Sequence, residues 1–299
     1  DRLADAAQKA DLPKGLFATL DLSYAQTEAF VRSGATDFIC FTGSVFGGRA
    51  IEKAAVESNR FLGLGLELGG KDPAYVRADA DLGFAIENIV DGALFNSGQS
   101  CCGIERVYVH HDLYDNFVEG AVALMGMYRL GDPRYQDTNL GPMVRKDAAA
   151  KVRAQINDAT RAGAVAHVDA EAFPDDAWGS PYLAPQLLTD VTHDMTIMNE
   201  ETFGPVIGVM PIDDDEHALQ LMNDCKYGLT ASIWTHDMAA VEAMAPRIES
   251  GTVFMNRCDY LDPGLAWTGV KETGRGATLS KVGYESRTRP QSWHFREHP

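Results

Sequence analysis

The sequence predicts an α/β protein with largely parallel sheets. Short apolar runs alternate with amphipathic stretches along most of the chain, which is the pattern of strands joined by helices. Apolar residues make up 45% and charged residues 23%, a balance that excludes wholesale disorder. With 299 residues, the chain is long enough for two domains and a sizeable buried core.

The beginning of the chain is predicted to contain two strands, each followed by a helix. A helix over residues 24–34 precedes them. Residues 37–41 and 61–68 are apolar runs of strand length. Residues 45–58 and 81–95 instead place apolar residues at helical spacing on one face. Because a doubly wound sheet usually has more strands, we expect a small or partial domain here.

The alternation continues through the rest of the chain. Bulky β-branched residues predict a strand over 106–110, and a helix over 146–162 ends before Gly163, a residue that suits a helix C-terminus. The later elements are strands over 206–210, 231–234 and 252–255, with helices over 215–224 and 237–249 between them. Helices between successive strands predict parallel pairing, since parallel strands need a long crossover connection.

Charge and cysteine content narrow the possible partners and compartments. A net charge of −17 argues against nucleic acid and anionic membranes as general partners. No apolar stretch approaches the roughly 20 residues that span a bilayer, and no signal peptide is visible. The five cysteines are odd in number and lie mostly in apolar segments, which indicates reduced thiols. We therefore expect a cytoplasmic protein that binds neither nucleic acid nor membrane.

A glycine and a serine join the strand at 37–41 to the following helix. Gly43 and Ser44 leave backbone N–H groups and the positive end of the helix dipole pointing at one spot, which suits a phosphate. The surrounding residues do not form G-x-G-x-x-G, the usual dinucleotide fingerprint. An ordinary turn with Ser44 as the helix N-cap explains the same residues.

Two further groups carry reactive side chains. Glu67 ends an apolar run just before two glycines, where a carboxylate of an α/β sheet meets ligands and can act as a general base. A structural glutamate bonded to the turn is an equal alternative. Cys101 and Cys102 follow small polar residues, which suits a thiolate nucleophile, although most cysteines are small apolar fillers.

The combination is more informative than each group alone. One predicted helix lies between Glu67 and Cys101 and returns the chain toward the same edge. Since no histidine lies in the cysteine motif, we expect the carboxylate to activate water and not the thiol. A thiol, a phosphate site and such a carboxylate predict thiolate addition to an aldehyde, hydride transfer to a nicotinamide and hydrolysis of the resulting thioester.

Five motifs occur in one order along the chain. They are Phe41-Thr42-Gly43-Ser44, Glu67-Leu68-Gly69-Gly70-Lys71, Gly98-Gln99-Ser100-Cys101, Glu200-Glu201-Thr202-Phe203-Gly204-Pro205 and Gly269-Val270-Lys271-Glu272-Thr273-Gly274. This order resembles the NAD(P)-dependent aldehyde dehydrogenase superfamily over nearly the whole chain. The resemblance implies an oxidoreductase that converts an aldehyde to a carboxylic acid through a cysteine thiohemiacetal and thioester.

The resemblance also implies roles for individual residues. Cys101 is the nucleophile, its backbone N–H forms half of an oxyanion hole, and Glu67 is the base for deacylation. The cofactor-binding residues are Gly43 and Ser44 at the pyrophosphate with Thr42 beside them, Leu68 at the nicotinamide, Glu201 at its ribose and Phe203 near its ring. No residue is expected to bind a metal. NAD is the expected cofactor, and NADP stays open.

The resemblance matches the C-terminal three fifths of the family's usual length. It implies a partial Rossmann-like dinucleotide-binding domain over residues 1–67 and an α/β catalytic domain with a parallel sheet over 68–256. Residues 257–299 are expected to return along the molecule and to end in an oligomerisation strand at 286–296, which implies a homodimer or homotetramer. The N-terminal part of the family supplies a second oxyanion donor, whose loss typically costs about 2.7–4 kcal/mol, so we expect this piece alone to be nearly inactive.

Two alternatives stay open for the function. Relatives that pass the acyl group to coenzyme A do not use the glutamate base, so Glu67 counts against them. A truncated, non-catalytic subunit is the second alternative. Among the other features, His110 and His111 are expected at the surface on opposite faces of a strand end, and Met125 and Met127 in the core.

Overall fold

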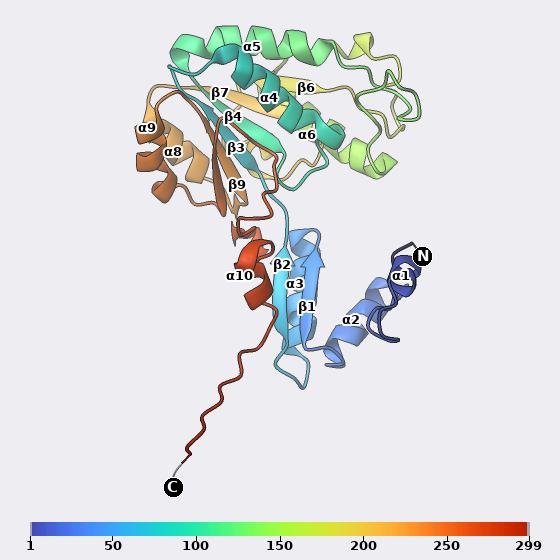
Figure 1. Ribbon diagram of the computed structural model, residues 1–299. Helices are drawn as coiled ribbons and strands as arrows, with labels where there is room; N and C mark the ends of the chain where they lie inside the picture. The colour runs from blue at the N-terminus through green and yellow to red at the C-terminus, as the bar shows by residue number, and fades with distance from the viewer. Residues whose placement is uncertain (1, 298–299) are drawn as a thin grey trace.

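The computed structural model describes residues 2–297, which form two lobes joined by a narrow neck (Figure 1). The large lobe is built on a seven-stranded sheet, and the small lobe on a three-stranded sheet. Both lobes contain parallel strand pairs with helices packed against the sheet. The predicted α/β fold class is therefore confirmed.

The large sheet is parallel except at one edge. In spatial order its strands are β10 (Thr252–Met255), β9 (Thr230–Trp234), β3 (Asp72–Val76), β4 (Ile104–His110), β7 (Val206–Ile212), β6 (Gln186–Thr189) and β5 (Val165–Ala166). Only β5 runs antiparallel to its neighbour. The four strands predicted for this sheet are confirmed to within two residues at each end, whereas β3, β5 and β6 were not predicted.

Helices cover both faces of this sheet. They are α4 (Leu82–Leu94), α5 (His111–Gly126), α6 (Lys146–Arg161), α7 (Thr196–Asn199), α8 (Asp215–Asn223) and α9 (Met238–Met244). Because side chains alternate along a strand, Val107 and Val109 of β4 pack on the side of α4 and α5, while Tyr108 packs on the side of α6 and α8. The buried sheet is thus a rigid frame for the loops at its edges.

Two helical expectations were partly wrong. The predicted helix over 237–249 ends at Met244 and continues as a 3-10 turn over Ala245–Arg247, because Pro246 has no N–H to donate within a helix. Met125 is buried in α5 as expected, but Met127 follows the last turn of that helix and is 67% exposed.

The small lobe contains the beginning of the chain and a returning segment. Its elements are α1 (Arg2–Lys9), α2 (Tyr24–Arg32), β1 (Phe38–Thr42), α3 (Val45–Val56), β2 (Gly63–Glu67), β12 (Gly274–Arg275) and α10 (Ser280–Glu285). β1 and β2 are parallel, and β12 adds to β2 in the antiparallel direction. β8 (Tyr227–Gly228) and β11 (Val270–Lys271) form a separate antiparallel two-stranded ribbon. The predicted domain boundaries remain predictions.

The C-terminal segment leaves the small lobe as an extended tail (Figure 1). Residues 286–297 form no helix or strand and are exposed. The strand expected at 286–296 is therefore not formed within this chain, since no strand of residues 2–297 pairs with the backbone of this segment. Its pairing with another subunit remains a prediction.

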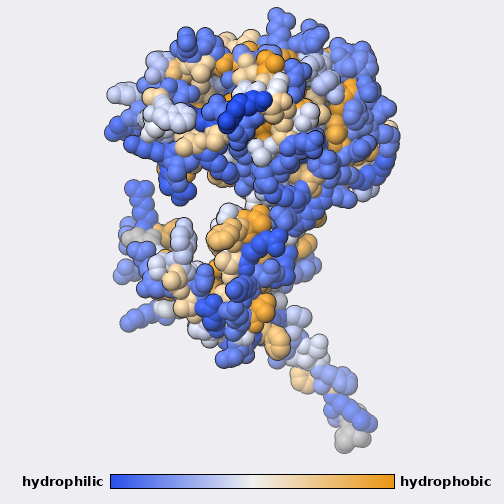
Figure 2. Space-filling view, turned by 180° about the vertical axis from the view of Figure 1, so that it is seen from behind, coloured by the Kyte–Doolittle hydropathy of each residue, from blue (hydrophilic) through white to orange (hydrophobic). Residues whose placement is uncertain are grey.

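Part of the small lobe's surface is apolar. Seen from behind, apolar patches lie on this lobe below the neck (Figure 2). Exposed apolar side chains of the lobe include Phe46, Val56 and Phe61.

Within residues 2–297, no helix is both long and apolar enough to cross a bilayer.

Candidate active site

A cavity of about 430 Å³ is lined by residues of both lobes. All eight predicted site residues line it, namely Thr42, Gly43, Ser44, Glu67, Leu68, Cys101, Glu201 and Phe203. They come from the ends of β1 and β2, from the loop before β4 and from the loop before β7. The structure therefore brings together residues that are up to 161 positions apart in the sequence, and their individual roles stay predictions.

The loop that carries Cys101 has an unusual backbone. After α4, Asn96, Ser97 and Gly98 all adopt positive φ angles of 51°, 59° and 69°, which turns the chain sharply back toward β4. At Gly98 a Cβ atom would lie 2.2 Å from the carbonyl oxygen of Gly204, so only glycine fits. The Gln99 side chain accepts a hydrogen bond from the Val144 N–H at 2.7 Å, which holds the loop against the large lobe.

The two thiols in this loop differ. Cys101 is half-buried and lines the cavity, while Cys102 is buried and does not. Interaction with the neighbouring Cys102 thiol lowers the pKa of Cys101, while burial and the carboxylates of Glu201 and Glu67 oppose that shift. The pKa of Cys102 is raised by the same interaction, by burial and by the charge of Asp259. Since a thiolate is the reactive form, the cavity contains the more reactive thiol.

Glu67 lies at the carboxyl end of β2, directly beside Thr42 at the end of β1. Parallel strands that end together place their last residues at one edge, which brings the carboxylate to the cavity.

Both the backbone and the side chain of the next residue, Leu68, are held in place. Its backbone N–H donates to the carbonyl of Thr273 at 2.9 Å, and its buried side chain fills the space that a Cβ on Gly48 would occupy.

The N-terminus of α3 opens on the same cavity. Ser44 is the N-cap of this helix, and its hydroxyl accepts a hydrogen bond from the Gly47 N–H at 3.2 Å. The capping alternative and the phosphate alternative are thus compatible, because the cap leaves other first-turn N–H groups without a helical partner. The helix dipole favours an anion here, so these residues fit the pyrophosphate of a dinucleotide.

Glu201 approaches the cavity from the large lobe. Its carboxylate accepts a hydrogen bond from the Gly70 N–H at 3.1 Å, and a Cβ on Gly69 would lie 2.5 Å from it. Burial raises the pKa of Glu201 to about 7, and the charge of Glu105 adds to this shift. Phe203, two residues on, adopts a φ of 55° and keeps its side chain 38% exposed.

A buried ion pair, which no local sequence pattern predicted, supports the segment before β7 that carries Glu201, called the Glu201 loop below. Lys71 and Glu105 are 0% and 4% exposed, and their charged atoms lie 2.5 Å apart. The Lys71 ammonium also donates to the Thr202 hydroxyl, while Glu105 accepts from the backbone N–H groups of Thr202 and Phe203 at 2.9 and 2.8 Å. The available signal was a lysine and a glutamate at the edges of apolar runs, where unpaired charges are costly.

The comparisons with known proteins agree with this geometry. A model of the aldehyde dehydrogenase family matches residues 1–292. The chain belongs to the aldehyde dehydrogenase family. The resemblance inferred from the five motifs is confirmed.

Individual relatives match nearly all of this chain. A succinate-semialdehyde dehydrogenase [NADP(+)] 1 of Mycobacterium tuberculosis is 36% identical over 281 residues, which are 94% of this chain and 60% of that protein. This chain therefore spans about three fifths of the length of the curated relatives that it matches.

Solved structures of aldehyde dehydrogenases share its fold. Lactaldehyde dehydrogenase from Escherichia coli matches 94% of this chain with a TM-score of 0.88 and 32% identity, and the match covers 58% of that structure. The NADP-dependent glyceraldehyde-3-phosphate dehydrogenase from Bacillus halodurans, complexed with NADP, matches 96% with a TM-score of 0.89 and 32% identity, over 59% of its chain.

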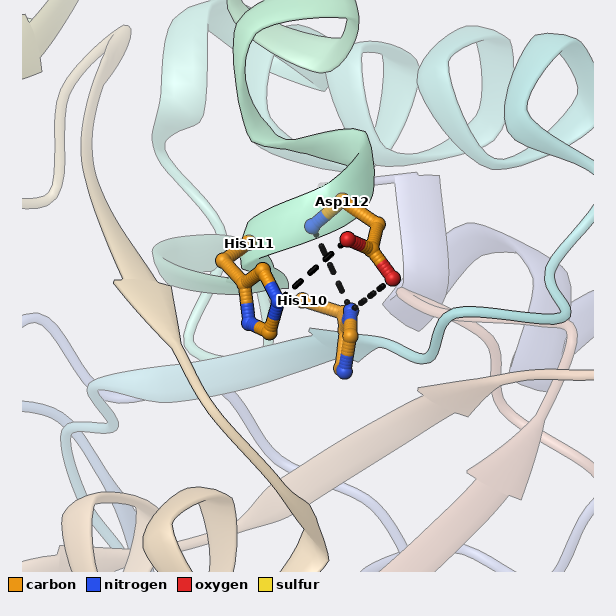
Figure 3. Close-up of side chains that lie close together, drawn as sticks. All are labelled: His110, His111 and Asp112. Carbon is orange, nitrogen blue, oxygen red and sulfur yellow. Dashed lines mark hydrogen bonds and ion pairs between the residues drawn. The ribbon is translucent and has the colours of Figure 1, made fainter.

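A histidine cluster lies away from the cavity, where β4 meets α5 (Figure 3). The rings of His110 and His111 stack with centroids 4.3 Å apart, so the expected placement on opposite faces is wrong. The reason is that His111 begins α5 and does not continue the strand. His110 accepts the Asp112 N–H at 3.3 Å and caps the helix.

The same cluster is the one group of three potential metal ligands among residues 2–297. His110, His111 and Asp112 surround the N-terminus of α5, where the helix dipole disfavours a cation. The cap also occupies a ring nitrogen of His110. The absence of a metal site therefore stays a prediction for this chain.

Replacing Glu201 by glutamine is expected to stabilise the fold above about pH 7. The folded-state pKa of about 7 exceeds the usual value of 4.5, so folding favours the protonated carboxyl. The wild-type chain therefore loses stability as the pH rises from about 4.5 to 7, by up to about 3 kcal/mol. The glutamine keeps the acceptor for Gly70 without this loss, so the gain should be absent near pH 4.5 and full above pH 7.

Urea unfolding of both forms across this pH range measures the effect. The control is Glu200→Gln, because Glu200 is an exposed neighbour paired with Lys226 at 2.6 Å. Equal stability changes for the two variants above pH 7 would contradict the prediction.

Proposed function

We propose that this chain carries the catalytic centre of an aldehyde dehydrogenase that converts an aldehyde to a carboxylic acid with NAD(P)+. The observation that carries the proposal is the single cavity in which Cys101, Glu67 and the N-terminus of α3 meet. A reactive thiol, a carboxylate and an anion site in one cavity are what aldehyde oxidation requires.

The cofactor fits the residues on both sides of the cavity. Gly43 and Ser44 would hold the pyrophosphate at the start of α3, with Thr42 beside them. Glu201 would accept hydrogen bonds from the nicotinamide ribose, and Phe203 would pack near the ring. When bound, NAD(P)+ supplies the hydride acceptor. The relatives include NADP-dependent and NAD-dependent enzymes, and we propose NAD with NADP as the alternative to be tested.

Cys101 and Glu67 act in different steps of the reaction, Cys101 in acylation and Glu67 in deacylation. The Cys101 thiolate adds to the carbonyl carbon, and the backbone N–H of Cys101 donates to the developing oxyanion. Once the hydride has left, Cys101 holds the acyl group as a thioester. Glu67 then takes a proton from the water that attacks this thioester, which releases the acid and returns the thiolate. Because Glu67 lines the cavity with Cys101, we favour water over coenzyme A as the acyl acceptor.

The wider setting of the protein is also a proposal. We propose that it works in the cytoplasm as a homodimer or homotetramer on a small aldehyde. All five cysteines are free, in agreement with a reducing compartment. The exposed backbone of residues 286–297 offers hydrogen-bonding groups to a second subunit.

The test is to incubate the 299-residue chain with NAD+ or NADP+ and a panel of aldehydes that includes succinate semialdehyde and lactaldehyde. At the low activity expected for this chain, reduced nicotinamide and free acid should form slowly, and an acyl group on Cys101 should be seen by peptide mass spectrometry after rapid quenching. A parallel sample with coenzyme A distinguishes acyl-CoA from acid. Neither reduced nicotinamide nor an acyl adduct with any aldehyde would overturn the proposal.

Replacing Glu67 by glutamine is expected to separate the two halves of the reaction. Acylation of Cys101 does not need the base, so about one equivalent of reduced nicotinamide should form in a burst. Steady-state acid production should fall by about 10²–10⁴-fold, the usual contribution of a general base. Stopped-flow absorbance measures both phases. Glu200→Gln, outside the cavity, should leave them unchanged, and normal steady-state acid production by Glu67→Gln would show that another group activates water.

A further inference from the structure

The loop before β4, called the nucleophile loop below, carries two adjacent thiols. One of the two lines the cavity and the other does not. Cys101 faces the cavity, whereas Cys102 is 5% exposed and packs with Leu229 and Trp267. Small polar neighbours surround both residues in the sequence. The feature that distinguishes the two thiols comes from a segment more than 150 residues later in the chain.

One carboxylate oxygen holds the residues on both sides of Cys101. Oδ1 of Asp259 accepts a hydrogen bond from the Cys102 thiol at 2.9 Å. The same oxygen accepts a hydrogen bond from the Ser100 hydroxyl at 2.8 Å. The main chain at Cys101 is therefore fixed from both sides, while its own sulfur is left to face the cavity.

The segment that carries Asp259 is anchored independently of the nucleophile loop. Asn256 exchanges two hydrogen bonds of 2.9 Å with the backbone of Thr235, after β9. The Cys258 thiol donates to the carbonyl of Asn88 in α4 at 3.3 Å. It also fills the space beside Gly92, where a Cβ would lie 2.5 Å from its sulfur.

Backbone strain at Asp259 also indicates that this segment is held in place by its surroundings. Asp259 adopts a φ of 44°, a left-handed conformation that a non-glycine residue adopts at a cost. Such a conformation persists where the surrounding structure imposes it, and here α4 and β9 hold the neighbouring residues. The Asp259 carboxylate thus contacts the nucleophile loop from a segment that is held by α4 and by the residue after β9.

We propose that Asp259 is a positioning residue that selects Cys101 over Cys102 as the nucleophile, by tying Ser100 and Cys102 to one carboxylate oxygen. A negative charge beside Cys102 keeps that residue a neutral thiol, because a second anion there would be repelled. The neutral thiol in turn donates its one proton to Asp259, which keeps Cys102 in its buried position outside the cavity. The inference rests on the proposed function only for the role of Cys101.

The test is site-resolved alkylation of the full 299-residue chain with iodoacetamide at a series of pH values. Tandem mass spectrometry assigns the first label to Cys101 or Cys102. Asp259→Asn keeps an oxygen acceptor of the same size but removes the charge. We expect the share of first labels on Cys102 to rise at least about tenfold, equivalent to one pKa unit, and its labelling to begin at lower pH.

The pH profile distinguishes a change in the pKa of Cys102 from a change in its exposure to the reagent. A change in exposure scales the labelling rate equally at every pH, whereas a change in pKa shifts the profile along the pH axis. Asp262→Asn is the matched control, because Asp262 lies in the same segment and caps only the Gly264 N–H at 2.8 Å. An unchanged Cys102 share and pH profile in Asp259→Asn would overturn the proposal. No aldehyde or nucleotide is used, so this failure would leave the proposed dehydrogenase activity untouched.

A second variant covers the case in which Asp259→Asn does not fold, as judged by its circular dichroism. Ser100→Ala removes one of the two donors to the Asp259 oxygen while keeping the carboxylate and both thiols. The nucleophile loop is then held by Asp259 from one side only, so the share of first labels on Cys102 should rise. A Cys102 share that is identical in the two proteins would overturn the proposal.

Discussion

Replacing Cys101 by alanine is expected to reduce aldehyde oxidation at least about 10⁴-fold, because loss of a covalent nucleophile removes the whole acyl-transfer route. Cys101 is the cysteine that lines the cavity, so no other thiol of residues 2–297 can take its place there. Reduced nicotinamide measured over time, with the best aldehyde of the panel, gives the rate.

Two other cysteines make the result specific. Cys102→Ala should cost no more than about tenfold, the equivalent of one pKa unit, since Cys102 lies outside the cavity and affects only the pKa of Cys101. Cys40→Ala should have no effect, because Cys40 is exposed in the small lobe. Equal losses in Cys101→Ala and Cys102→Ala, or full activity in Cys101→Ala, would disprove the assignment of the nucleophile.

Replacing Lys71 by methionine is expected to destabilise the fold by about 3–5 kcal/mol, the cost of leaving one partner of a buried ion pair uncompensated. Glu105 would then keep its backbone donors from Thr202 and Phe203 but face no cation. The ammonium also holds the Thr202 hydroxyl at 2.9 Å, so the Glu201 loop should loosen as well. Urea unfolding measures the loss of stability.

The matched control is Lys226→Met. Lys226 pairs with Glu200 at a similar distance of 2.6 Å, but both side chains are substantially exposed, so the expected cost is about 0–1 kcal/mol. A double variant, Lys71→Met with Glu105→Gln, should lose less than the two single changes together, because no unpaired charge remains. A loss for Lys71→Met no larger than that for Lys226→Met would contradict the buried-pair argument.

The strands that could be predicted were those with a clear local pattern. The apolar run of β1 and the β-branched residues of β4 carry their own signal. β3 was missed because it begins with Asp72 and Pro73, which by themselves favour a turn. The Asp72 carboxylate is buried in the fold and accepts the N–H of Thr230 at 3.1 Å, a partner that is 158 residues away.

The candidate site likewise contains residues that the sequence predicted and residues that it did not. The residue types of Glu67 and Cys101, and the helix between them, were enough to predict a thiol and a carboxylate at one edge. They did not predict that Lys71 and Glu105 support the Glu201 loop, or that Asp259 anchors the nucleophile loop. These partners lie in other elements, and no local spacing connects them.

The amino-acid sequence by itself determined the alternation of strands and helices, the family and eight of the residues that line the cavity. These follow from local periodicity and from short motifs, which need only neighbouring residues. The tertiary structure alone decided that His110 and His111 stack, that Met127 is exposed, and that Asp259 binds both Ser100 and Cys102. Those outcomes depend on contacts between distant segments, where burial and the nearest charge set the conformation and reactivity of a side chain.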